Sequence, residues 1–97
     1  MTEPIYKLTL GKTYYEKGFF NLGVAVERYV SKKDCEMTLL LGEARKKLHG
    51  TMSRKPNQNS TPRVYGNNEL RNWFMRSYEL NDKIDVIVEN PTTLWLK

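Results

Sequence analysis

The sequence predicts a single, mainly β domain with one or two short helices. Residues 5–10 and residues 83–89 alternate apolar and polar side chains, which is the period of a half-buried strand. Residues 37–41 are apolar on both faces, as expected for a strand in the centre of a barrel or sandwich. Residues 67–78 instead place apolar side chains at helical spacing. A length of 97 residues allows one domain with one core, and 39% hydrophobic residues is ordinary for a folded chain.

The segment after the first strand is predicted to be a polar, aromatic loop. It covers residues 12–17, between two glycines, and holds two exposed tyrosines, Tyr14 and Tyr15. Residues 19–30 are apolar and rich in β-branched residues, but Gly23 interrupts them. The pattern there leaves a strand and a short helical turn both open.

The middle of the chain is predicted to form an edge strand, a polar loop and a second short strand. Residues 46–55 are weakly patterned, as in the edge strand of a curled sheet, where lysines guard the unpaired edge. Residues 56–60 form the loop, and residues 61–66 the short strand.

The remainder is predicted to be a helix followed by two strands. Asn67 or Asn68 is a suitable cap for the helix. Its apolar face, which we assign to the core, consists of Leu70, Trp73, Phe74 and Tyr78. A turn at residues 81–82 leads into the alternating strand, and a turn at residues 90–91 leads into a closing strand at residues 92–96.

The positive charge of the chain is concentrated in one segment. The whole chain has a formal net charge of +5, whereas residues 44–63 contain six basic residues and no acidic one. These are Arg45, Lys46, Lys47, Arg54, Lys55 and Arg63. Such a concentration is typical of an edge that binds a polyanion, although charged residues of a solvated edge give the same pattern. The loop within this segment is rich in amides and hydroxyls, which donate and accept hydrogen bonds as the reading of base edges requires.

No catalytic, metal-binding or cofactor-binding set is recognisable in the sequence. Cys35 lies between two carboxylates, which disfavours a thiolate, and His49 has no adjacent nucleophile. One cysteine and one histidine cannot assemble a zinc site, and no glycine-rich phosphate loop is present. No apolar run approaches the roughly 18 residues that span a bilayer. We therefore expect a monomeric, non-enzymatic domain without metal or cofactor, located in the cytoplasm of a bacterium or in the nucleus of a eukaryote.

The order of these elements resembles the plant B-three DNA-binding domain. It is more similar to the effector domains of bacterial restriction endonucleases, which share the DNA-binding pseudobarrel fold. Three stretches carry the resemblance, namely residues 61–66, residues 69–74 with their Leu-x-x-Trp-Phe pattern, and residues 78–88. The turn before the last of these strands usually holds a Gly-Asp pair, whereas this chain has Asn81 and Asp82, and asparagine tolerates the same backbone geometry. The resemblance covers essentially the whole chain and implies an open seven-stranded pseudobarrel.

The resemblance also implies that two arms clamp the major groove of double-stranded DNA. The first arm matches Lys12, Thr13, Tyr14, Tyr15 and Lys17. The second arm matches Ser53, Arg54, Lys55, Asn57, Gln58, Asn59, Ser60, Thr61 and Arg63. We expect phosphate contacts from Lys12, Lys17, Lys46, Lys47 and Lys55, and base contacts from Arg54, Arg63, Asn57, Gln58 and Asn59. In a restriction system, a separate nuclease domain or subunit would supply the cleavage.

Two other functions fit the same sequence features. A basic β-barrel that binds RNA or single strands would stack bases on Tyr14 and Tyr15. A barrel that binds proteins would use its basic edge to contact an acidic partner.

Overall fold

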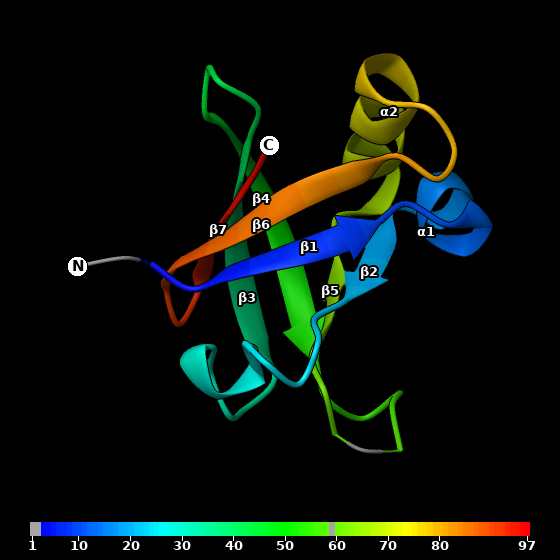
Figure 1. The fold of residues 1–97 in the computed structure, drawn as a ribbon. Helices are drawn as coiled ribbons and strands as arrows, with labels where there is room; N and C mark the ends of the chain where they lie inside the picture. Colours follow the sequence, from blue (N-terminus) through cyan, green and yellow to red (C-terminus); the bar gives the residue numbers. More distant parts are fainter. Residues whose placement is uncertain (1–2, 59) are drawn as a thin grey trace.

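The computed structural model describes residues 3–58 and 60–97 of the chain. In this part, seven strands form one curled sheet, with two short α-helices and one 3-10 turn (Figure 1). The strands are β1 (Ile5–Thr9), β2 (Phe19–Asn21), β3 (Cys35–Leu41), β4 (Lys46–Ser53), β5 (Arg63–Tyr65), β6 (Lys83–Asn90) and β7 (Thr93–Leu96). The helices are α1 (Lys12–Lys17), α2 (Asn67–Ser77) and the 3-10 turn η1 (Glu27–Tyr29). The prediction of a mainly β, open seven-stranded pseudobarrel is confirmed.

The strand order is β1-β6-β7-β3-β4-β5-β2. Neighbouring strands are antiparallel except for β3 and β7, which are parallel. The two edge strands are therefore β1 and β2, and the described residues form no strand pairing between them. The sheet curls until these edges lie near each other, as the tight contact between the Tyr6 ring and Gly23 shows. We call this unpaired junction between β1 and β2 the seam.

The core fills the inside of the curled sheet, and the strand alternation predicted from the sequence is confirmed. Leu8, Ile84, Val86 and Val88 are all buried. The central apolar strand is β3, fourth of seven in the order, as expected from its apolar residues on both faces. The helix α2 buries Leu70, Trp73 and Phe74, and Tyr78 packs against them, which confirms the predicted apolar face. None of the helices in the part of the chain described is long and apolar enough to cross a membrane.

The segment predicted as an aromatic loop is the helix α1, and its tyrosines are not fully exposed. Tyr14 and Tyr15 pack against the core, and the Tyr15 hydroxyl donates a hydrogen bond to the Tyr78 carbonyl at 3.0 Å. The helix ends at Gly18, whose φ of +75° and N–H bond to the Tyr14 carbonyl close the last turn. Six residues are too few to form a stable helix alone, so packing against α2 stabilises this one.

Two further expectations are corrected by the structure. The strand β4 is an edge strand over only part of its length, because it pairs with β3 through residues 46–52 but with β5 only through residues 51–53. The helix α2 has Gly66 as its N-cap and no side-chain capping bond, so neither Asn67 nor Asn68 caps it.

Residues 19–30 contain both alternatives left open by the sequence, since β2 is followed by the turn η1. Asn81 has a φ of +72°, as the predicted turn requires.

Candidate functional site

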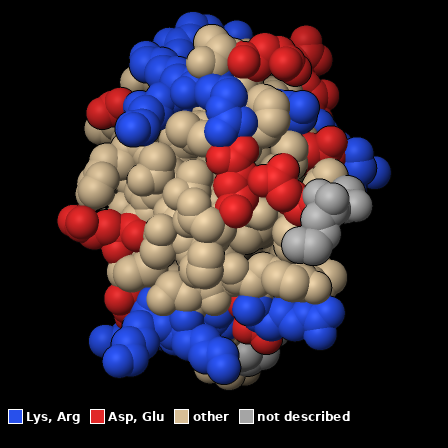
Figure 2. All heavy atoms as spheres, turned by 90° about the vertical axis from the view of Figure 1, so that its left-hand side faces the viewer, with Lys and Arg blue, Asp and Glu red and all other residues tan. Residues whose placement is uncertain are grey.

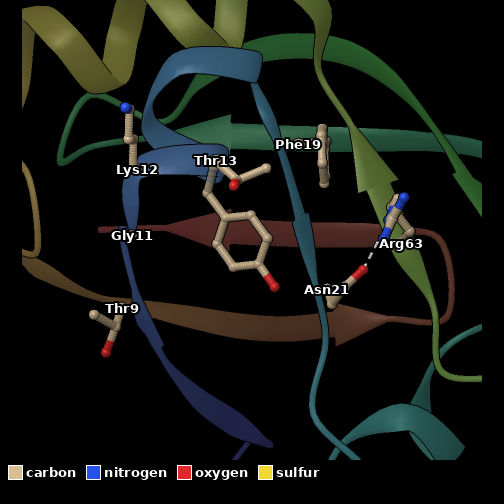
Figure 3. A pocket seen from close by; sticks show the side chains of 8 residues that line it. Thr9, Gly11, Lys12, Thr13, Phe19, Asn21 and Arg63 are labelled. Atoms are coloured by element: carbon tan, nitrogen blue, oxygen red, sulfur yellow. Dashed lines mark hydrogen bonds between the residues drawn. The ribbon is translucent and has the colours of Figure 1, made fainter. Parts of the chain in front are cut away.

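A concave recess of about 510 Å³ opens at the seam, where β1 and β2 do not pair. It is lined by Thr9, Gly11, Lys12, Thr13, Tyr14, Phe19, Asn21 and Arg63, and we call it the seam recess. Figure 3 shows Thr9 on one side, Asn21 and Arg63 on the opposite side, and Lys12 at one end. The seam recess thus brings together three residues of the predicted first arm and Arg63 of the second.

An aromatic side chain of β1, Tyr6, reaches the residues that follow β2 across the seam. The ring of Tyr6 lies so close to Gly23 that a Cβ atom added there would be 2.5 Å from Tyr6 Cε1. Burial raises the pKa of the Tyr6 hydroxyl, and the nearby Tyr14 raises it further. The seam is therefore closed at Tyr6 and open at the seam recess.

Arg63 is fixed in the wall of the seam recess by three neighbours. Its Nε donates to Asn21 Oδ1 at 3.0 Å, and its Nη2 donates to Asn57 Oδ1 at 3.2 Å. Its guanidinium carbon lies 4.7 Å from the centre of the Phe19 ring, at cation–π distance. Among the described residues, neither hydrogen on Nη1 has a partner. The guanidinium is thus held in one orientation with donors still available.

Asn21 is the residue of this site that sequence reasoning missed. It lies directly opposite Arg63 in the antiparallel pairing of β2 and β5. Its Oδ1 accepts hydrogen bonds from both Arg63 Nε and Asn57 Nδ2, each at 3.0 Å. Within the described part of the chain its Nδ2 has no partner. The position of Asn21 opposite Arg63 becomes apparent only from the strand register, because the sequence pattern leaves a strand and a helical turn both open for residues 19–30.

Asn57 holds the loop of residues 54–62 rather than projecting from it. Its Nδ2 donates to Asn21 Oδ1 and to the Thr61 carbonyl at 2.9 Å, while its Oδ1 accepts from Arg63. Both polar atoms of the side chain are therefore used within the protein. The expected contact between Asn57 and a base does not fit this arrangement, and the structure gives Asn57 the role of orienting Arg63.

Arg54 is likewise committed within the protein. Its Nη1 donates to Glu27 Oε2 at 2.6 Å and to the Ser60 carbonyl at 3.0 Å. Its Nη2 donates to the Glu27 carbonyl at 2.8 Å and the Ser31 carbonyl at 3.0 Å, and its Nε also donates to Ser31 at 3.1 Å. All five N–H donors of the guanidinium are thus occupied. The donors that the predicted base contact of Arg54 would need are therefore engaged within the protein, where this side chain ties two loops together.

The other residues of the predicted second arm differ in their surroundings. Lys55, Gln58 and Ser60 are exposed, and Thr61 is buried. Asn59 lies outside the described residues. Ser53 donates its hydroxyl to Asp34 at 2.9 Å. The backbone N–H of Arg54 and then this hydroxyl hold the pKa of the Asp34 carboxyl below its ordinary value, with a smaller contribution from Lys55.

The basic segment of the sequence is divided between two ends of the molecule. Lys46 and Lys47 line a small cleft of about 120 Å³ together with Arg76. From Lys46 to Ser53, which is paired with Arg63, β4 spans roughly 23 Å at about 3.3 Å per residue. Figure 2 shows Lys and Arg side chains gathered at two opposite ends of one face, with uncharged residues and several Asp and Glu side chains between them. The structure therefore does not place all the predicted phosphate contacts around one groove.

The predicted first arm is also altered, because its residues lie on the packed helix α1. Lys12 and Thr13 are exposed at the seam recess, whereas Lys17 is exposed at the last turn of the helix and does not line the recess. In the described part of the chain, no group of three His, Cys, Asp or Glu residues is arranged to hold a metal ion.

No protein-family model matches the sequence, and no curated protein matches it.

Proposed function

We propose that this chain is a sequence-specific, double-stranded DNA-binding domain that serves as the target-recognition module of a restriction endonuclease. The observation that carries the proposal is the fixed orientation of Arg63, which lines the seam recess and whose Nη1 has no hydrogen-bond partner among the described residues. Arginine pairs with guanine through two donors, and a guanidinium already held in place loses less side-chain entropy on binding. The restriction-system part of the proposal rests on the sequence resemblance, and the nuclease would be another domain or chain.

The exposed lysines around this arginine support a nucleic acid as the partner. Lys12 lies at one end of the seam recess, and Lys55 lies on the loop that Asn57 holds beside Arg63. Compact ammonium groups suit phosphate contacts, which supply sequence-independent affinity through counterion release. Gln58 and Ser60, also exposed on this loop, offer groups that pair with base edges.

The single-strand alternative loses its main structural support. It relied on two exposed tyrosines as stacking platforms, but both rings pack against the core and Tyr15 donates its hydroxyl to the Tyr78 carbonyl, so that of the two only Tyr14 lines the seam recess. Competition between duplex DNA and single-stranded RNA of equal length distinguishes the two functions, because our proposal expects the duplex to bind more tightly.

Selection of bound oligonucleotides from a random duplex pool tests the proposal. We expect a consensus that contains a guanine, and Arg63→Ala should weaken binding to it by about 5-fold to 150-fold, equivalent to 1 to 3 kcal/mol, with little effect on random DNA. Arg76→Ala is the matched control, since it makes the same change at the other end of β4 and should leave the preference for the consensus unchanged. Absence of a consensus, or equal loss of preference in both variants, would count against sequence-specific recognition.

A further inference from the structure

The shape of the seam recess indicates what kind of group it accepts. The grooves of duplex DNA are themselves concave, so they are read by parts of a protein that project into them. A recess of about 510 Å³ has the opposite shape, and its size is within the range of pockets that hold small organic ligands. A base turned out of the helical stack is the part of DNA that projects far enough to enter such a recess.

The lining of the seam recess suits a flat ring better than a phosphate group. The rings of Tyr14 and Phe19 form part of its wall, with their centres 5.8 Å apart in an edge-to-face arrangement. Aromatic walls favour a planar base, because stacking of bases on such rings contributes about 1 to 3 kcal/mol per base. A phosphate gains nothing from these walls.

The seam recess combines side-chain nitrogen donors with the hydroxyls of Thr9, Thr13 and Tyr14, which can donate or accept. Nη1 of Arg63 and Nδ2 of Asn21 have no partner among the described residues, and the Thr9 hydroxyl is on the opposite side (Figure 3). Guanine presents two acceptors side by side, O6 and N7, whereas adenine and cytosine present an amino donor on the corresponding edge. Lys12 at one end of the recess is suitably placed for the phosphate of the same nucleotide.

We propose that the seam recess binds one guanine base turned out of the DNA duplex, with Arg63 and Asn21 donating to its acceptor edge. This inference rests on the proposed function and specifies how Arg63 reads its base. The Tyr14 ring partly replaces the stacking that the base loses, while the Phe19 ring, over which the Arg63 guanidinium lies, adds apolar wall, and Lys12 contacts the backbone of the nucleotide.

Duplexes that differ only in base pairing test this inference. Each guanine of the selected consensus is placed in turn opposite cytosine or opposite an abasic position, so that the guanine itself is kept. Unpairing and unstacking a base costs a few kcal/mol, and the abasic position removes part of that cost. At one guanine, we expect the duplex with the abasic site to bind about tenfold more tightly or better than the duplex with cytosine, equivalent to 1.4 kcal/mol. When thymine replaces this guanine opposite the abasic site, we expect no such gain.

Two variants that fill the seam recess provide the second part of the test. Gly11→Phe adds a ring at a position where a new Cβ meets nothing within 4 Å and φ is −65°, and Thr9→Phe does so from β1. Both should abolish the gain from unpairing, whereas Arg76→Ala should retain it. Binding of the consensus duplex without a gain at any guanine, or a gain that persists in both filled variants, overturns the extruded base and leaves the proposed function intact. Failure to bind any duplex overturns both.

Discussion

Replacement of Arg54 by methionine should destabilise the fold, although the residue lies in a segment that looks like a nucleic-acid contact. The side chain of Arg54 is 14% exposed and that of Glu27 is 37% exposed, so the ion pair between them is only partly buried. Removal of the guanidinium leaves Glu27 and the carbonyls of Ser31 and Ser60 without this donor.

The size of the effect follows from these contacts. Breaking a fully buried pair costs about 3 to 5 kcal/mol, and exposed pairs contribute about 0 to 1 kcal/mol. With water reaching Glu27, we expect Arg54→Met to lower the free energy of unfolding by about 2 to 4 kcal/mol. Arg54→Lys should recover less than half of this, because an ammonium group has three donors and cannot reproduce the planar fork.

Urea denaturation of the two variants beside Arg28→Met checks this reasoning. Arg28 lies close by on η1, and its contacts are exposed ones with the adjacent Tyr29, so the same substitution there should change stability by about 0.5 kcal/mol or less. If Arg54→Met is no more destabilising than Arg28→Met, Arg54 does not hold the two loops together.

Two further predictions concern the backbone at Gly18 and the carboxyl of Asp34. Gly18→Ala should lower the free energy of unfolding by about 2 kcal/mol or more, because φ is +75° and the new Cβ would be 2.3 Å from the Asn67 carbonyl oxygen. Gly11→Ala should be nearly neutral, because its new Cβ meets nothing within 4 Å. Similar losses of stability in both variants, measured by urea denaturation, would refute the argument. The folded-state pKa of Asp34 is lowered from its ordinary value of 3.8. The ionised carboxylate therefore stabilises the fold fully at a pH above 3.8, and this stabilisation is lost as the pH falls through the folded-state pKa. Wild type should therefore lose more stability than Asp34→Asn on acidification below about pH 5, and parallel pH profiles would contradict the assignment.

The parts of the fold that could be predicted from sequence are those in which a local period decides which side chains face inward. Ile84, Val86 and Val88 alternate because successive side chains of a strand face opposite sides, and all three are buried. Leu70 and Phe74 lie one helical turn apart and are buried together. The helix α1 escaped prediction because six residues carry too little periodicity, and its stability comes from packing against α2.

The roles of individual site residues could not be predicted in the same way, because distant contacts determine them. Arg54 and Arg63 belong to one basic segment, yet the first is occupied by Glu27, 27 positions away, and the second is oriented by Asn21, 42 positions away. Neither contact can be inferred from the sequence before the pairing of the strands is known. Lys46 also belongs to this segment, but the extended strand β4 carries it to the opposite end of the sheet.

The alternation of side chains along β1 and β2 also separates the core residues from the residues that line the seam recess. Thr9 lies between the buried Leu8 and Leu10, and Asn21 lies between the buried Phe20 and Leu22. The inward residues are 0% to 1% exposed and pack in the core, whereas Thr9 and Asn21 line the recess. Each of these two strands is paired on one side only, β1 with β6 and β2 with β5. Because β1 and β2 are not paired across the seam, a change of the exposed Thr9 side chain removes neither a core contact nor a hydrogen bond between the two strands. Asn21 differs, because its Oδ1 accepts hydrogen bonds from Arg63 and Asn57. Substitution of Thr9 should therefore change what the recess binds more than it changes stability, whereas substitution of Asn21 should also release the hydrogen bonds that orient Arg63.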